Sequence, residues 1–113
     1  MATKEAVKDQ LDKIVTKLEE VGPYVAEDWG GSVQFIFPDL DAAWFLQMAM
    51  DGTVESLVEK IDEEAATGVV EMHSDAFIGV YAKTMSTDEA RAKGQMRTRK
   101  SMEALIKVIA PTL

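Results

Sequence analysis

The residue types that most suggest chemistry stand side by side at His73, Ser74 and Asp75, and His73 is the only histidine of the chain. These are the side chains of a catalytic triad, but a triad is assembled in space, and consecutive residues rarely face one another in its geometry. Ser74 and Asp75 are explained by a helix that begins here, because a serine oxygen caps the first turn and a carboxylate suits its positive end. We therefore predict no catalytic residue and no enzyme activity.

The acidic side chains are numerous but scattered, with Asp39 and Asp41 in one turn and Glu63 and Glu64 in a loop. The Asp39-x-Asp41 pair lacks the further ligands, the central glycine and the distal glutamate of a calcium-binding EF-hand loop. The chain has no pair of histidines that could hold zinc, and it has no glycine-rich phosphate-binding loop. The sequence therefore predicts neither a metal site nor a cofactor.

One basic cluster stands out in this acidic chain, and it consists of Arg91, Lys93, Arg97, Arg99 and Lys100. The alternating pattern places Arg97 and Arg99 on the same face of a strand. The cluster has two interpretations. It is either a solvated strand face that balances nearby acids, or a docking patch for an anionic head group, a carboxylate or an acidic partner.

Length and composition fit one domain that spans residues 1–113, since a chain of this size buries a single sizeable core. Its apolar fraction of 47% and charged fraction of 28% are ordinary for a globular protein. The net charge of -8 argues against binding to nucleic acids or adsorption to anionic membranes, because both require clustered lysine and arginine.

The absence of cysteine excludes disulfides and thiolate chemistry, and it fits a reducing compartment. The first residues lack the apolar core of a secretion signal. No stretch approaches the roughly 20 apolar residues of a membrane-spanning helix. We predict a cytoplasmic protein without stable membrane insertion.

The first two thirds of the chain read as one helix followed by strands. Apolar residues at helical spacing predict an amphipathic helix from Thr3 to Val21, which Gly22-Pro23 should end. Alternation predicts four antiparallel strands, with Asp51-Gly52 as a hairpin turn between the second and the third. These strands are Ser32–Phe37, Ala42–Met50, Thr53–Ile61 and Thr67–His73.

The last third reads as helix, short helix, strand and helix. The helices begin at Ser74, Thr87 and Ser101, and the strand covers Gln95–Arg99. The final helix carries an apolar stripe that consists of Met102, Leu105, Ile106 and Ile109. The sum is an α+β fold with a five-stranded, mainly antiparallel sheet covered by helices.

Methionines are enriched at predicted core-facing positions or at the ends of elements. They are Met48, Met50, Met72, Met85, Met96 and Met102. Because methionine is flexible and polarisable, such a set suits a surface that must fit varied apolar shapes. Ordinary core packing explains the same enrichment, and the composition leaves both explanations open.

The order of the C-terminal segments resembles that of the sterol carrier protein 2 (SCP-2) family. The segments that carry the resemblance are Glu71–Phe77, Ala90–Thr98 and Met102–Val108, with Trp44-Phe45-Leu46 upstream. The similarity extends from Gly30 to Val108. It implies a five-stranded sheet covered by helices, which enclose an apolar tunnel for sterols, fatty acids or acyl-CoA thioesters. It also implies that the domain has no catalytic residues of its own.

Two segments depart from the family pattern. Ala90-Arg91 replaces an Ala-Phe pair, and Gly94-Gln95-Met96-Arg97-Thr98 replaces a Gly-Lys-Leu-Lys-Ile strand. Both changes make the implied cavity smaller or more polar. A fatty acid, or another amphipathic molecule with a carboxylate near Arg91, is therefore at least as good a candidate ligand as a sterol.

We therefore predict that the chain binds an apolar or amphipathic lipid-like ligand in an internal cavity, as a possible lipid carrier. The predicted ligand-binding residues are Trp44, Leu46, Met48, Phe77, Tyr81, Met96, Met102, Leu105 and Ile106, with Arg91 as a head-group partner. The alternative is an interaction module with a filled core that acts through a partner enzyme or as a homodimer. An enzyme that uses His73 is the weakest alternative.

Overall fold

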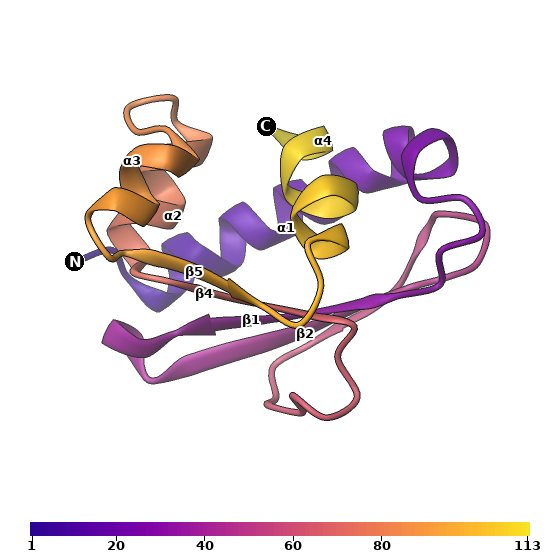
Figure 1. Cartoon of the computed structure of the whole chain (residues 1–113), viewed down its shortest axis with the longest axis horizontal. Helices are drawn as coiled ribbons and strands as arrows, with labels where there is room; N and C mark the ends of the chain where they lie inside the picture. Colours follow the sequence, from indigo (N-terminus) through magenta and orange to yellow (C-terminus); the bar gives the residue numbers. More distant parts are fainter.

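The computed structural model describes residues 1–113 and contains one five-stranded sheet with the strand order β3-β2-β1-β4-β5. The helices labelled α1 to α4 lie on one side of the sheet, and the connection between β3 and β4 passes on the other side (Figure 1). The strands are β1 (Ser32–Phe37), β2 (Ala42–Met48), β3 (Val54–Val58), β4 (Gly68–Met72) and β5 (Met96–Arg99). The helices are α1 (Lys4–Val25), η1 (Pro38–Leu40), α2 (Ser74–Tyr81), α3 (Thr87–Ala92), η2 (Leu105–Ile109) and α4 (Ala110–Thr112).

The predicted α+β class and the five-stranded, mainly antiparallel sheet are confirmed. The expectation that the first four strands are all antiparallel is wrong, because β1 and β4 are parallel, with Val33 opposite Gly68 and Ile36 opposite Glu71. The β3–β4 connection causes this arrangement. The buried Gln34 side chain donates to the Lys60 carbonyl (2.9 Å) and accepts from the Asp62 N–H (2.6 Å). These bonds hold the connection across the sheet, so that β4 enters on the far side of β1.

Helix α1 packs on the sheet through Val7, Leu11, Ile14 and Leu18, as the helical spacing predicts. It does not end at Gly22-Pro23, however, and continues to Val25. A proline inside a helix removes one backbone N–H and crowds the preceding turn, which is tolerated here because the helix ends within the next turn. No helix of the structure has the length and apolar character needed to cross a bilayer.

At Gly22 the backbone of α1 contacts the turn between β2 and β3. A Cβ atom on Gly22 would overlap the Gly52 carbonyl oxygen, and one on Gly52 would overlap the Gly22 carbonyl oxygen. Gly52 also has a φ of +90°, a conformation that favours glycine. The two glycines therefore let the helix approach the turn as closely as backbone atoms allow.

The final helix begins as predicted, since the Ser101 hydroxyl oxygen accepts from the Glu103 N–H at 3.0 Å. Its central segment η2 is a π-helix, which the regular stripe of the sequence did not indicate. The helix approaches β4 at Gly68, where a Cβ atom would lie 2.6 Å from that of Ala104. Because a π turn is wider than an α turn, it changes which side chains face the sheet.

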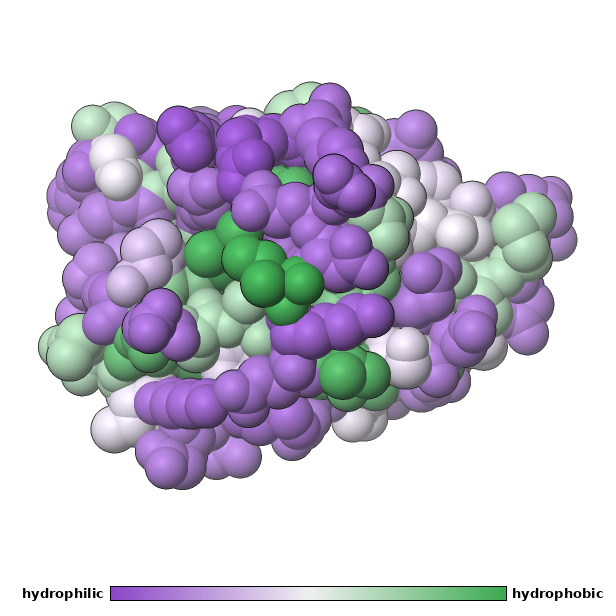
Figure 2. All heavy atoms as spheres, turned by 90° about the horizontal axis from the view of Figure 1, so that it is seen from below, coloured by the Kyte–Doolittle hydropathy of each residue, from purple (hydrophilic) through white to green (hydrophobic).

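The sheet has two unlike faces. The helix-covered face carries the main core, which includes Phe35, Phe37 and Trp44. On the other face, a small cluster of Phe45, Ala66 and Val69 lies beneath the β3–β4 connection. Figure 2 shows this second face, with apolar side chains in its middle and polar side chains around them. Thus β2 is apolar on both faces, as predicted. Both β2 and β3 are shorter than the sequence indicated.

Candidate functional site

Most predicted ligand-binding residues meet between the sheet and the helices, and we call this region the inner layer. Its members are Trp44, Leu46, Met48, Phe77, Tyr81, Met96 and Leu105. The rings of Phe77 and Tyr81 are 5.3 Å apart, and Phe37 lies 5.0 Å from Phe77 and 5.8 Å from Trp44. All three pairs meet edge to face, an arrangement that adds to the stability gained by burial. Strands β1 and β2 and helix α2 thus share one row of aromatic rings.

Two predicted ligand-binding residues, Met102 and Ile106, are not part of the inner layer. Met102 is 49% exposed and Ile106 is 60% exposed. The inward face of the final helix is formed instead by Ala104, Val108 and Ile109, all of which are buried. Ala104, Val108 and Ile109 recur at ordinary helical spacing, so the inward face of the helix is rotated relative to the predicted stripe, which places Met102 and Ile106 outside.

The inner layer is filled by its own side chains. Trp44, Leu46, Met48 and Phe77 are each at most 2% exposed. The structure has five pockets, and Trp44 is the only one of these four residues that lines any of them, a surface pocket formed mostly by charged side chains of α1. A ligand in this layer would therefore have to displace side chains or helices.

A single side-chain hydrogen bond joins α2 to α4 over the inner layer. The hydroxyls of Tyr81 and Thr112 are 2.8 Å apart. Because the Thr112 hydroxyl already donates to the Val108 carbonyl oxygen, the Tyr81 hydroxyl is the donor. Burial raises the pKa of Tyr81, so this donor remains protonated. No pattern in the sequence indicates this contact.

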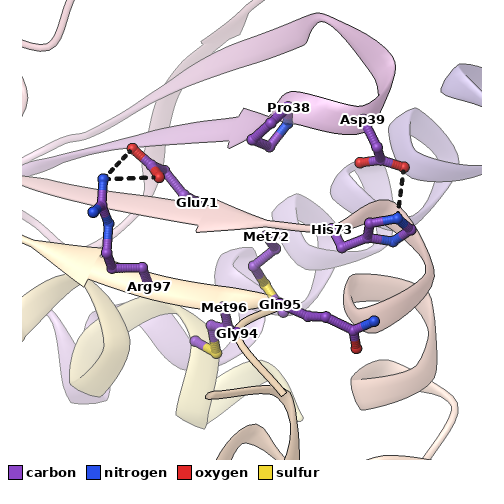
Figure 3. Close-up of a pocket in the computed structure, with 9 residues that line it drawn as sticks. All are labelled: Pro38, Asp39, Glu71, Met72, His73, Gly94, Gln95, Met96 and Arg97. Atoms are coloured by element: carbon purple, nitrogen blue, oxygen red, sulfur yellow. Dashed lines mark hydrogen bonds and ion pairs between the residues drawn. The ribbon is translucent and has the colours of Figure 1, made fainter. Parts of the chain in front are cut away.

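The residues that resemble a triad lie beside a shallow pocket of about 380 Å³ at the ends of β4 and β5 (Figure 3). His73 faces Asp39, with 3.6 Å between Nε2 and the carboxylate oxygen. Ser74 is fully buried, and its hydroxyl donates to the same carboxylate at 2.5 Å. The hydroxyl is therefore held by Asp39 rather than by the imidazole, and the geometry of a nucleophilic serine is absent.

The prediction that Ser74 caps α2 is also wrong, since His73 caps it. The imidazole Nδ1 accepts from the Asp75 N–H at 3.3 Å, which leaves the hydrogen of the neutral ring on Nε2. The Ser74 N–H donates to Asp39 at 2.9 Å. Burial alone would raise the pKa of Asp39, but the hydrogen bonds from Ser74 and the nearby His73 outweigh burial and lower it. Helix α3 begins at Thr87, as predicted, and its cap is the preceding residue, Ser86.

The basic cluster is largely neutralised within the chain. Glu71 accepts from Arg97 at 3.2 Å and from Arg99 at 2.5 Å. Arg99 also pairs with Glu63, and Lys100 donates to the backbone carbonyls of the β3–β4 connection. Arg97 and Arg99 do share a face, as predicted, and their contacts favour the charge-balancing interpretation over a docking patch.

The ion pairs of Glu71 make stability depend on pH. Burial alone would raise the pKa of Glu71, but the hydrogen bonds and charges of Arg99 and Arg97 lower it below 4.5. The ionised carboxylate therefore stabilises the fold above about pH 4.5, and this contribution is lost as the pH falls through the lowered pKa. We expect Glu71→Gln to lower the free energy of unfolding, measured by urea denaturation, by about 2 kcal/mol at pH 7 and by less at pH 3. A loss of equal size at both pH values would contradict this explanation.

Arg91, the predicted head-group partner, differs from the rest of the cluster. Its Nη2 atom is buried and has no hydrogen-bond partner, and the same is true of Oε1 of Gln95. Arg91 lies in the last turn of α3 and Gln95 just before β5, where the Gln95 N–H donates to the Ala90 carbonyl at 2.8 Å. Most buried polar atoms in proteins are paired, so these two atoms mark an unusual position.

Sequence comparison finds no relative, since no protein-family model and no curated protein matches the chain. Solved structures do match. Sterol carrier protein 2 like 2 from Aedes aegypti is similar with a TM-score of 0.70 and 12% identity, over 95% of this chain and 96% of that chain. The solution structure of palmitated SCP2L2 from Aedes aegypti matches with a TM-score of 0.68 and 12% identity, over 98% and 95%.

Two further solved structures with other described roles also match. The ubiquinone synthesis protein UbiJ-SCP2 matches with a TM-score of 0.65 and 13% identity, over 99% of this chain and 93% of that chain. The sec-alkylsulfatase Pisa1 from Pseudomonas sp. matches with a TM-score of 0.59 and 14% identity, over 89% of this chain. The chain spans only 13% of the length of that alkylsulfatase. Over nearly its whole length, this chain has the fold of sterol carrier protein 2.

Proposed function

We propose that this chain is a lipid-binding domain that holds an apolar or amphipathic ligand in the inner layer. The observation that carries the proposal is the SCP-2 fold along nearly the whole chain, shared with a protein whose structure is described as palmitated. The mostly apolar inner layer lies where the family resemblance implies a lipid tunnel. Binding, rather than catalysis, also fits the Ser74 hydroxyl, which is held by Asp39.

Because the inner layer is filled, binding of a lipid there requires its side chains or helices to move. Burial of a lipid chain would contribute about 25 cal/mol for each Å² of apolar surface, before the costs of association. The buried methionines Met48, Met72 and Met96 can change rotamer more easily than branched side chains. The Tyr81–Thr112 hydrogen bond joins helix α4 to α2. Displacement of α4 would open the inner layer.

Leu105→Trp should reduce uptake of palmitate about tenfold, which corresponds to about 1.4 kcal/mol, because the larger ring occupies space that the ligand needs. Leu105 is half-buried and packs against the core. The measurement is native mass spectrometry of the protein mixed with palmitate, after organic extraction of any lipid that copurifies. A defined copurifying lipid would identify the ligand class directly.

Met50→Trp is the matched control, because Met50 is 60% exposed and lies in the turn between β2 and β3. It should leave uptake unchanged. Equal uptake by wild type and Leu105→Trp would show that the ligand binds elsewhere. A wild-type protein that takes up no palmitate and carries no extracted lipid would contradict the proposed function.

The second candidate is an interaction module that forms a homodimer, and the filled inner layer favours it. Apolar residues on the side of the sheet away from the helices supply a surface. Val58 of β3 is 46% exposed, and Ile61, which is 62% exposed, lines a pocket of about 280 Å³ together with Ile36. A mass that rises with protein concentration in light scattering would favour this candidate, and a constant monomer mass would exclude it. Localisation in the cytoplasm stays a prediction from the sequence.

A further inference from the structure

Strand β3 covers only part of the edge of β2. In the register of the two strands Phe45 lies opposite Val58, and β3 ends there. The chain then leaves the edge and passes onto the second face of the sheet, where the Lys60 carbonyl accepts from Gln34. The segment Ala42–Trp44 of β2 therefore has β1 on one side and no strand on the other. We call this segment the open edge.

The open edge presents backbone groups that no strand pairs. The Met48 N–H donates to the Gly31 carbonyl (2.9 Å), on the side of β1. The Ala49 N–H donates to the Thr53 carbonyl (2.8 Å), on the side of β3. Because the backbone groups of a strand alternate between its two neighbours, the N–H and carbonyl of Ala43 point to the side that β3 has left. An unpaired edge of this kind is a template for pairing with another chain.

A pocket of about 280 Å³ adjoins the open edge on the second face of the sheet. Ala43 of β2 and Ile36 of β1 line it and lie opposite each other in the sheet. Ile61 lines it from the β3–β4 connection and is 62% exposed. Since the side chains of a strand alternate between its two faces, every second side chain of a strand added to the open edge would point toward this pocket. An aliphatic side chain there would cover Ile61.

Another pocket, of about 380 Å³, adjoins the same edge on the helix side. Its lining residues are Trp44 of the open edge, Glu59, and Lys4, Glu5, Lys8 and Asp9 of α1. The two lysines are already paired with carboxylates, at 2.6 and 2.7 Å, whereas Glu5 and Asp9 have no ion pair. The intervening side chains of an added strand would point toward this pocket, and its two unpaired carboxylates favour basic side chains.

We propose that the open edge of β2 pairs with an extended segment of another protein, whose side chains alternate between aliphatic and basic. Main-chain hydrogen bonds to Ala43 supply affinity and register in this mode of binding, and the two pockets supply specificity. A second copy of this chain is a poorer occupant, because each copy carries a net charge of -8 and the two repel each other. The inference is independent of what the inner layer binds.

The test uses two acetylated and amidated peptides of the same composition and charge. One alternates, Lys-Val-Lys-Val-Lys-Val-Lys, and the other is blocked, Lys-Lys-Lys-Lys-Val-Val-Val. In isothermal titration calorimetry, wild type should bind the alternating peptide at least about tenfold more tightly, because only that peptide presents valine and lysine on opposite faces of a strand. In the complex, the Ala43 amide should exchange its hydrogen at least about tenfold more slowly, since it then donates to the peptide.

Two variants test the two pockets. Ile61→Asp should weaken binding of the alternating peptide about tenfold, because the pocket on the second face loses its apolar contact. Its matched control is Ile106→Asp, since Ile106 is 60% exposed and lines neither pocket. Glu5→Lys should weaken binding by a similar factor, because a like charge then faces the peptide. Glu19→Lys makes the same change at an exposed position of α1 that lines neither pocket.

Equal affinity for the two peptides, or no binding of either, overturns the proposal. It is also overturned if exchange of the Ala43 amide is unchanged in the complex, or if each control variant weakens binding as much as the variant it matches. Light scattering of the free protein tests the other occupant. A dimer that Ile61→Asp dissociates and the alternating peptide does not displace would assign the open edge to a second copy, against the proposal.

Discussion

Asp39→Asn is expected to lower the free energy of unfolding by about 3 kcal/mol, as measured by urea denaturation at pH 7. The Asp39 carboxylate accepts both the N–H and the hydroxyl of Ser74, and Ser74 is 0% exposed. An asparagine keeps one oxygen but turns an NH2 group toward a donor. At least one buried polar group of Ser74 then loses its partner and cannot recover it from water.

Asp41→Asn is the control for this prediction, because Asp41 is exposed, lies in the same turn and has a left-handed backbone conformation that asparagine accepts. It should change the free energy of unfolding by less than about 0.5 kcal/mol. If the two variants are equally stable, the hydrogen bonds between Asp39 and Ser74 do not stabilise the fold.

Gly22→Ala should lower the free energy of unfolding by about 3 kcal/mol, although alanine has a higher helix propensity than glycine. The added Cβ atom would overlap the Gly52 carbonyl oxygen, which is backbone and cannot rotate away. Either α1 or the turn between β2 and β3 must move, and the packing of both against the core is then disturbed. The midpoint of thermal unfolding, followed by circular dichroism, measures the effect.

Gly79→Ala provides a matched comparison, since Gly79 is also helical. A Cβ atom there would lie 3.3 Å from the Thr84 hydroxyl oxygen and 3.4 Å from the Met85 side chain, which are atoms that can yield. We expect this variant to be neutral or slightly stabilised. If Gly22→Ala unfolds at the same temperature as Gly79→Ala, the close contact at Gly22 is not a constraint on the fold.

Regular periodicity predicted the elements of this fold well. The alternation of Val33, Phe35 and Phe37 placed them in the core, and the spacing of Leu11, Ile14 and Leu18 placed the buried face of α1. The errors occur where a contact between residues far apart in the sequence determines how a strand or helix is placed. The sequence could not show that Gln34 binds the β3–β4 connection or that β4 therefore runs parallel to β1.

Periodicity also located part of the candidate site, and contacts between distant residues account for part of what it missed. Trp44, Phe77 and Tyr81 meet because each belongs to an element whose buried face is clear from the pattern. Met102 and Ile106 were misplaced because a second stripe of Ala104, Leu105, Val108 and Ile109 has the same helical spacing, and spacing alone does not choose between the two. The bonds from Ser74 to Asp39 and from Tyr81 to Thr112 join residues 35 and 31 positions apart, and no local rule predicts them.

The parallel pairing of β1 with β4 also divides the folding reaction into local and distant steps. The antiparallel hairpins of β1–β2 and β2–β3 involve neighbours in sequence, and hairpins form in about 1–10 μs. Pairing β1 with β4 requires a much larger loop to close before any of its contacts form. Proteins dominated by such distant contacts fold more slowly. We therefore expect the three-stranded meander of β1, β2 and β3 to form first and the C-terminal half of the chain to close onto it last.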